Sequence, residues 1–231
     1  MLGISKLALS VQPSATLAAG AKARQLRAQG VKVFDFSLGE PDFPTPEHIC
    51  QAAIAAMKSG QTHYTIAHGT VELRTAISRW YKKVYNLDCT PDQIIVSNGA
   101  KHSIHNALLT LVGPGDEVII PTPFWVSYSD LVSMTGATPV LIPCSMEADF
   151  KVSAAQIKKA ITPKTKLLLI NSPSNPTGAV YTHAELEAIA DLVLEANIGV
   201  ISDEIWPDAL HHCPWNGRAS NSDFALVQES L

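Results

Sequence analysis

The sequence predicts an α/β protein with an open, mostly parallel sheet and helices on both faces. From residue 94 onward, segments with the pattern of strands alternate with helical segments, as in open α/β sheets. Residues 167–170 and 198–202 are continuously apolar, which is typical of strands covered on both faces. A helix expected over 183–196 separates these two strands, and such a βαβ unit makes them parallel. Sites in sheets of this kind lie at the carboxyl ends of the strands.

Composition narrows the class of protein. The 231 residues are 46% hydrophobic and 16% charged, which is typical of a globular chain with a sizeable core. The net charge of −4 disfavours a nucleic-acid partner. No apolar run has the length of a membrane span, and the apolar N-terminal stretch is short and interrupted, so we expect a cytoplasmic protein. The scattered positions of the cysteines disfavour a disulfide scaffold or a zinc module. The four cysteines are Cys50, Cys89, Cys144 and Cys213.

The first part of the chain reads as helix, short strand and turn. A helix is expected over 15–29, with Ser14 as its N-cap and Gly30 closing it. A short strand is expected at 33–36, and the proline-rich residues 39–46 have turn chemistry.

The remaining elements follow from hydrophobic periodicity. Apolar residues at three- and four-residue spacing predict helices over 47–58, 70–85, 102–112 and 183–196. Short apolar or alternating runs predict strands at 94–97, 117–121, 139–143, 166–171 and 199–203.

Two predicted strands are followed by segments that could contact a ligand. Residues 97–109 form a glycine-containing turn that leads into a helix, where backbone N–H groups and Lys101 could bind a phosphate. The alternative is an ordinary capped helix. Trp125, just after the strand at 117–121, could stack on a planar ligand or simply be a core or interface residue.

Two further strand ends carry polar groups. The loop 171–181 contains two prolines and a glycine and presents Asn175, whose amide can hydrogen-bond a phenolic or carbonyl oxygen. A plain turn is the alternative. Asp203 ends an apolar strand, where a carboxylate requires a cation or donors, and an ion pair or helix cap would also satisfy it.

Together these strand ends match one ligand. A phosphate site, an aromatic platform, an amide donor and a buried carboxylate fit a molecule with a phosphate, a flat ring, a ring oxygen and a protonated ring nitrogen. Pyridoxal 5′-phosphate has these parts. An anion beside its pyridine nitrogen keeps the ring protonated and makes it an electron sink.

The motifs resemble the class I aminotransferases of pyridoxal-phosphate fold type I, in particular the bacterial aspartate/prephenate aminotransferase branch. The resemblance runs from about Leu7 to Trp206. It rests on the segments SVQPSAT (10–16), GEPDFPTP (39–46), YTIAHGTVELR (64–74), SNGAKHSI (97–104), PTPFWVSY (121–128), NSPSNPTG (171–178) and ISDEIW (201–206). It implies an N-terminal arm and part of a small domain at 1–40, a partial cofactor-binding large domain at 41–206, and an atypical tail at 207–231.

The resemblance also implies roles around the cofactor ring. Trp125 stacks on the pyridine ring, Asn175 bonds the ring hydroxyl oxygen, and Asp203 pairs with the ring nitrogen. Trp125 and Asn175 also border the substrate. Trp206 stands where the family usually has a tyrosine that helps hold the ring oxygen, and its indole N–H could partly substitute.

Further roles concern the phosphate, the substrate and a partner subunit. Gly99, Ala100 and Lys101 lie at the phosphate site in this resemblance, and Lys101 also faces an acidic substrate side chain. Gly39 contacts the substrate carboxylate through its backbone. Tyr64 reaches the phosphate of a neighbouring subunit, which implies a homodimer with shared sites.

The chain departs from the family pattern after Trp206. The family continues with a Ser-x-x-Lys segment whose lysine forms the Schiff base, whereas no lysine follows Lys166 here, so no catalytic residue is assigned. The arginine that would clamp the substrate carboxylate is also missing, since only Arg218 follows. We therefore interpret 207–231 as an out-of-frame or truncated tail, and expect the sheet to end at 199–203 with an exposed edge.

Three hypotheses on function remain. The first is an aminotransferase that transfers an amino group between an amino acid, aspartate or glutamate, and a 2-oxo acid, although the 231 residues could be inactive alone. The second is a non-catalytic remnant or cofactor-binding dimerisation partner. The third is a carbon–sulfur lyase of the same fold.

A metal site is not predicted, because His211, His212 and Cys213 are adjacent and no second cluster completes a ligand set.

Overall fold

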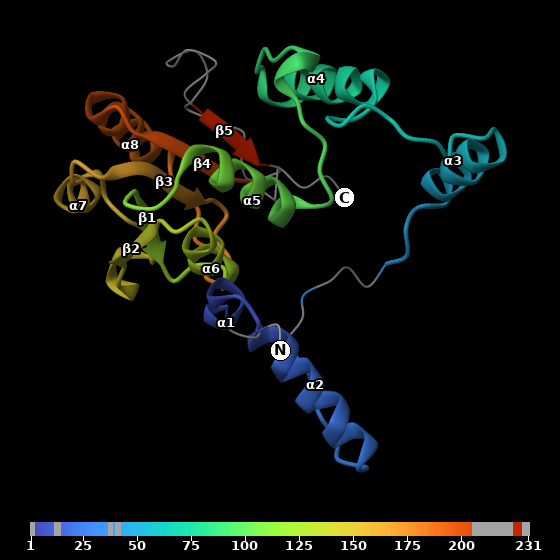
Figure 1. Cartoon of the computed structure of the whole chain (residues 1–231), viewed down its shortest axis with the longest axis horizontal. Coiled ribbons are helices and arrows are strands. Elements are labelled where there is room, and N and C mark those ends of the chain that lie inside the picture. Colours follow the sequence, from blue (N-terminus) through green and yellow to red (C-terminus); the bar gives the residue numbers. More distant parts are fainter. Residues whose placement is uncertain (1–2, 12–14, 37–38, 40–42, 205–223, 228–231) are drawn as a thin grey trace. The chain divides into compact units, whose positions relative to one another are not determined.

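The computed structural model describes residues 3–11, 15–36, 39, 43–204 and 224–227 (Figure 1). The chain divides into two compact units. One consists of Met1–Val11 and Val71–Leu231, and the other of Gln12–Thr70. Each unit is described by itself.

The larger unit contains a five-stranded sheet with the order β2-β1-β3-β4-β5 (Figure 1). All four neighbouring pairs are parallel. The strands are β1 Glu117–Thr122, β2 Thr138–Pro143, β3 Thr165–Asn171, β4 Gly199–Asp203 and β5 Phe224–Val227. The predicted strands at 117–121, 139–143, 166–171 and 199–203 are confirmed. So is the parallel pairing of β3 with β4, which aligns Asn171 with Asp203.

The helices also follow the hydrophobic periodicity. They are α1 Lys6–Ser10, α2 Ala15–Ala28, α3 Glu47–Lys58, α4 Val71–Tyr85, α5 Ala100–Leu111, α6 Ser127–Met134, α7 Ala154–Ala160 and α8 His183–Ala196, with 3₁₀ turns η1 Pro91–Gln93 and η2 Met146–Ala148. The five predicted helices are confirmed within a few residues, whereas α1, α6 and α7 were not predicted. Gly30 has φ +80° after α2, while the predicted cap Ser14 lies outside the described residues. In the part of the chain that is described, no helix has the length and apolarity needed to cross a membrane.

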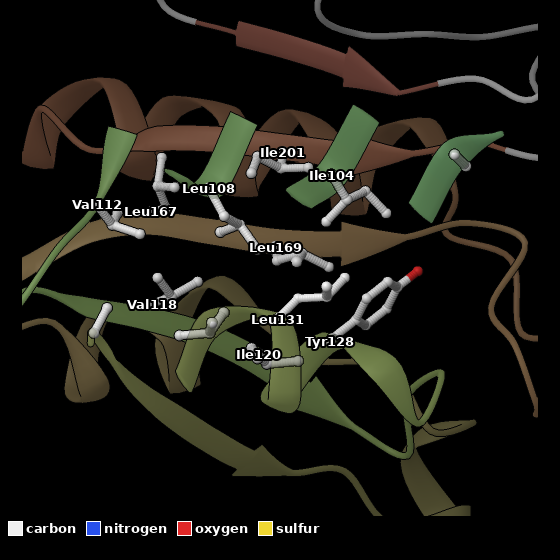
Figure 2. Close-up of a cluster of buried hydrophobic side chains, with 13 residues drawn as sticks. Ile104, Leu108, Val112, Val118, Ile120, Tyr128, Leu131, Leu167, Leu169 and Ile201 are labelled. Atoms are coloured by element: carbon white, nitrogen blue, oxygen red, sulfur yellow. The ribbon is translucent and has the colours of Figure 1, made fainter. Parts of the chain in front are cut away.

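Successive side chains of the sheet point to opposite faces and form two cores. On one face Val118, Leu167 and Ile201 pack with residues of α5 and α6, as Figure 2 shows. On the other face Leu168 and Val200 pack with residues of α7 and α8. The continuously apolar sequence of β3 therefore has a simple cause, because both sides of the strand are covered.

Side-chain caps fix the first residues of α7 and α8, the helices that cover the second face of the sheet. Thr182 and Glu185 form a capping box at the start of α8, and Ser153 and Gln156 form one at the start of α7. Each box satisfies backbone N–H groups that the first helical turn leaves without partners. The first residues of both helices are therefore determined by the local sequence.

Two predicted strands are wrong. Residues 33–36 and 94–97 have no regular secondary structure. A β-strand exists only when a neighbouring strand pairs with it, and no described strand lies beside either segment. Their apolar side chains are correspondingly exposed: Phe36 is 95% exposed and Ile95 is 71% exposed.

The expectation that the sheet ends at 199–203 is also wrong. β5 lies within the segment interpreted as an atypical tail, and it pairs with β4 from Val200↔Phe224 to Asp203↔Val227. The backbone groups of β4 are therefore hydrogen-bonded on both sides. Local patterning could not reveal this pairing, because the 20 residues between Asp203 and Phe224 separate the two strands in sequence.

The smaller unit buries little of its apolar surface. Helix α3 has no buried residue, and in the described part of the unit Ala23 is the buried hydrophobic residue. Several large apolar side chains are exposed there: Leu17, Phe34, Phe36, Phe43, Met57 and Tyr64. Covering these side chains with other protein would stabilise the unit, because it removes apolar surface from water.

We expect Leu168→Ala to lower the free energy of unfolding by about 2–5 kcal/mol, because its side chain is fully buried and truncation leaves a cavity. Leu141→Ala removes the same atoms from a side chain on the edge strand β2 that is 48% exposed, and should cost less than about 1 kcal/mol. Urea denaturation of both variants measures the difference. Equal losses would contradict the assignment of the core.

Candidate functional site

The carboxyl ends of β1, β3 and β4 carry the candidate site. These strands end at Thr122, Asn171 and Asp203, and all are parallel, so their ends share one edge of the sheet. Trp125 lies in the segment that follows β1, and Asn175 lies in the loop that follows β3. The location agrees with the general placement of sites in open α/β sheets.

Asp203 is the buried charge of this edge. Asp203 is 1% exposed, and its Oδ2 accepts a hydrogen bond from the hydroxyl of Tyr128 on α6. Tyr128 is also 1% exposed. Figure 2 shows this hydroxyl pointing away from the aliphatic side chains of the core. Burial and the neighbouring Asp203 carboxylate raise the pKa of Tyr128, which keeps its hydroxyl protonated and able to donate.

Trp125 connects this buried pair to the start of α5. Its ring lies 5.5 Å from that of Tyr128 at an interplanar angle of 77°, an edge-to-face contact. The Nζ of Lys101 lies 4.8 Å from the centroid of the Trp125 ring, in cation–π contact. A continuous series of contacts therefore runs from Lys101 through Trp125 and Tyr128 to Asp203.

The turn before α5 presents backbone N–H groups at the same edge. Gly99 is the N-cap of α5 with φ +80°, a conformation that a residue with a Cβ adopts only with strain. Ala100 and Lys101 begin the helix, where N–H groups have no partner within the helix and favour an anion. The turn is closed by Gly99 N–H donating to Ser97 O, at 3.0 Å.

Asn175 lies in the loop after β3, and its side chain is exposed. Its backbone N–H donates to Oδ1 of Asn171 at 2.6 Å, and Nδ2 of Asn171 donates to the backbone O of Asp203 at 2.8 Å. Six of the predicted site residues therefore lie in one connected set on the larger unit: Gly99, Ala100, Lys101, Trp125, Asn175 and Asp203.

The remaining predicted residues are not brought into this set. Gly39 and Tyr64 belong to the smaller unit and are exposed. Trp206, His211, His212 and Cys213 lie outside the described residues. Within the described ranges, no group of three His, Cys, Asp or Glu side chains could hold a metal ion.

Sequence reasoning missed Tyr128 and Asn171. Tyr128 stands three residues after Trp125, one helical turn on, so the spacing within PTPFWVSY could have suggested that the two residues share a face. Asn171 is the last residue of β3 and pairs with Asp203 in register, but no local pattern indicates that its side chain holds two backbone groups.

A second buried carboxyl group follows Asp203. Glu204 is 5% exposed, and its Oε1 accepts a hydrogen bond from Ser202 Oγ at 2.7 Å. Burial raises the pKa of Glu204 to about 7, and the negative charge of adjacent Asp203 adds to this shift. The group therefore changes charge near neutral pH, next to the buried aspartate.

This donor set fits pyridoxal 5′-phosphate. A buried carboxylate suits a protonated ring nitrogen, and the Trp125 ring suits a flat heterocycle. Helix N–H groups with a lysine suit a phosphate. Asn175 is held beside the same strand ends and has an amide that can donate to a ring oxygen.

Comparison with known proteins defines the class of protein. Residues 31–221 match the family model described as aminotransferase class I and II, and the chain belongs to this family. The family uses pyridoxal phosphate, and its solved members have the parallel α/β architecture of fold type I. The match continues beyond Trp206, so the expectation that the resemblance stops there is wrong.

Individual relatives are aspartate aminotransferases. The chain is 47% identical over 222 residues to an aspartate aminotransferase of Bacillus sp. (strain YM-2), covering 96% of this chain and 55% of the relative. It is 44% identical to an aspartate/prephenate aminotransferase of Cereibacter sphaeroides, covering 89% and 52%. The structure of Thermus thermophilus aspartate aminotransferase with maleate aligns with a TM-score of 0.86 and 42% identity, covering 89% and 54%. The chain thus spans about half the length of the relatives it matches.

We expect Tyr128→Phe to lower the free energy of unfolding by about 2 kcal/mol, because it removes a donor to a buried carboxylate. Tyr64→Phe is the matched control, since that hydroxyl belongs to a fully exposed side chain and its loss should leave stability unchanged. Urea denaturation at pH 7 compares the two variants. A Tyr128→Phe protein as stable as the control would refute the role of this hydrogen bond.

The raised pKa of Glu204 gives stability a pH dependence. Its carboxyl is protonated in both states below its ordinary pKa of 4.5, and between there and about pH 7 only the unfolded state loses the proton. The contribution of Glu204 to the free energy of unfolding therefore falls by about 3 kcal/mol as the pH rises from 4.5 to about 7.

Glu204→Gln should flatten the fall in stability between pH 4.5 and 7, because glutamine keeps an acceptor for Ser202 without titrating. Glu195→Gln, on an exposed part of α8, should leave the profile as in the unmodified chain. Denaturation across this pH range measures both. An unchanged profile for Glu204→Gln would show that another group dominates.

Proposed function

We propose that these 231 residues form the cofactor-binding part of a pyridoxal-phosphate-dependent aminotransferase. It would transfer an amino group between an amino acid, aspartate or glutamate, and a 2-oxo acid. The observation that carries the proposal is the contact series Lys101–Trp125–Tyr128–Asp203, which places a cation, an aromatic face and a buried carboxylate at one sheet edge. The names of the relatives support the choice of reaction and substrate.

The chain's own residues have distinct tasks in this proposal. Asp203 would hold a proton at the ring nitrogen, and the Tyr128 hydroxyl orients its carboxylate. Trp125 would cover one face of the ring, and the Asn175 amide would donate to the ring oxygen. The N–H groups at the start of α5, together with Lys101, would bind the phosphate. When bound, the cofactor supplies an electron sink for charge that develops at the substrate Cα.

Substrate contacts and assembly extend the proposal. The Lys101 ammonium group is suited to an acidic substrate side chain, while Gly39 would bind the substrate carboxylate through its backbone. We also propose a homodimer in which Tyr64 reaches the phosphate of a neighbouring subunit. Full exposure of Tyr64 and the exposed apolar side chains of the smaller unit support this assembly.

We place the protein in the cytoplasm, and keep 1–40, 41–206 and 207–231 as the proposed domain organisation.

Proton transfer needs a base that these residues do not supply. No lysine follows Lys166 in the sequence, and Lys166 is near the amino end of β3, at the sheet edge opposite the site. Lys101 is at the proposed phosphate site. Turnover would therefore require a lysine from outside the 231 residues. The second candidate function, favoured by the same observation, is a cofactor-binding chain without turnover.

Cofactor binding can be tested with pyridoxine 5′-phosphate, which has no aldehyde and cannot react with surface lysines. We expect the probe to quench tryptophan fluorescence, because Trp125 lies at the proposed ring position. Asp203→Asn should weaken binding by about tenfold to one-hundredfold, since it removes a charge-assisted hydrogen bond worth about 1.5–3 kcal/mol. Glu195→Gln, exposed on α8, should bind as the unmodified chain does.

Absence of binding by the unmodified chain, or equal binding by Asp203→Asn, would overturn the proposed site. Turnover is tested separately by co-expression with the C-terminal half of Bacillus subtilis aspartate aminotransferase, a 46% identical relative. Formation of glutamate from aspartate and 2-oxoglutarate would support an aminotransferase completed by a second segment. Binding without turnover would favour the non-catalytic candidate, and release of ammonia would indicate a lyase.

A further inference from the structure

We infer that Asn171 is a positioning residue that fixes the spacing between Asn175 and Asp203. The inference rests on the proposed function, in which these two residues contact the ring oxygen and the ring nitrogen of the cofactor. Asn171 itself contacts backbone atoms of both residues and acts through them.

The geometry of Asn171 is specific to an amide side chain. Its Nδ2 donates to Asp203 O at 2.8 Å, while its Oδ1 accepts from Asn175 N–H at 2.6 Å. Making both bonds at once requires a donor and an acceptor on the same side chain, and the planar amide supplies one of each. An aspartate at this position keeps the acceptor and loses the donor, and a leucine of similar volume loses both.

The position of Asn171 in the sheet explains how far its influence reaches. It is the last residue of β3 and lies in register with Asp203, the last residue of β4. Its backbone is therefore fixed by the sheet, and its side chain extends that order into the loop that follows. The residue is partly buried, and its hydrogen bond to Asp203 O is partly shielded from competing water, whereas its hydrogen bond to Asn175 N–H is exposed.

The loop after β3 has an internal closure that does not depend on Asn171. Ser174 N–H donates to Ala179 O at 2.9 Å, and Gly178 N–H donates to Ser174 O at 2.8 Å. These bonds shape the loop tip, whereas the bond to Asn171 ties Asn175 to the sheet edge. Loss of the Asn171 amide would leave the loop closed but let Asn175 move relative to Asp203.

Amide hydrogen exchange tests the tie without any ligand. We expect Asn171→Leu to speed exchange at Asn175 N–H by about tenfold, and Asn171→Asp to change it by less than about threefold, because aspartate keeps the acceptor. Ser174 N–H is an internal reference in the same loop and should keep its rate. Asn106→Leu, at an exposed position of α5, is the matched control for loss of an asparagine. Unchanged exchange at Asn175 in Asn171→Leu would overturn the inference.

Ligand binding tests the consequence for the site. In Asn171→Leu we expect the dissociation constant of pyridoxine 5′-phosphate to rise about tenfold, and that of inorganic phosphate, measured by calorimetry, to change by less than about twofold. Inorganic phosphate reports on the turn before α5 and not on the ring contacts. The near-ultraviolet absorbance of the bound probe should also shift, because the ring nitrogen is held less firmly beside Asp203. A purely structural role would weaken both ligands together and leave the absorbance of the bound probe unchanged.

The outcomes separate the inference from the proposed function. If the unmodified chain does not bind the probe, the proposed cofactor site fails and the inference fails with it. If the unmodified chain binds and Asn171→Leu binds equally well, only the inference is overturned. Should Asn171→Leu not fold, Asn171→Asp still decides, because it breaks the bond to Asp203 O alone and should weaken probe binding by about threefold to tenfold. Unweakened binding by Asn171→Asp would then overturn the inference.

Discussion

The site depends on a carboxylate buried at the end of an apolar strand. Burying an ionised carboxylate is costly unless hydrogen bonds or a cation compensate for the lost water. Here the Tyr128 hydroxyl donates to Asp203, and Tyr128 is in turn packed against Trp125 and the core. The Tyr128 hydrogen bond thus joins α6, which also packs in the core through Leu131 and Val132, to the end of β4.

The parallel sheet makes this convergence possible. Parallel strands place their carboxyl ends at one edge, so residues far apart in sequence meet without long loops. Tyr128 and Asp203 are 75 residues apart, and Asn171 and Asp203 are 32 apart, yet each pair is hydrogen-bonded. Coverage on both faces excludes water from the strands beneath, which strengthens polar contacts at their ends.

Membership of the aminotransferase family gives this arrangement its meaning. A buried carboxylate, an aromatic ring and a helix N-terminus are each common in proteins, and each has an ordinary structural explanation. Their connection through direct contacts, in a chain 47% identical to an aspartate aminotransferase, supports a single cofactor site. The described residues of the smaller unit expose several large apolar side chains, which the proposed homodimer would have to cover.

The sequence by itself determined the elements whose signals are local. Hydrophobic patterning predicted the strands 117–121 and 199–203 and the helices 47–58 and 183–196. Asp203 and Trp125 were predicted from their places at the end of one apolar strand and just after another. Only the tertiary structure decided that 33–36 and 94–97 are not strands and that 224–227 is one, because a strand exists through its neighbour. The same reason hid the tasks of Tyr128 and Asn171. Their hydrogen bonds join residues that only folding brings together.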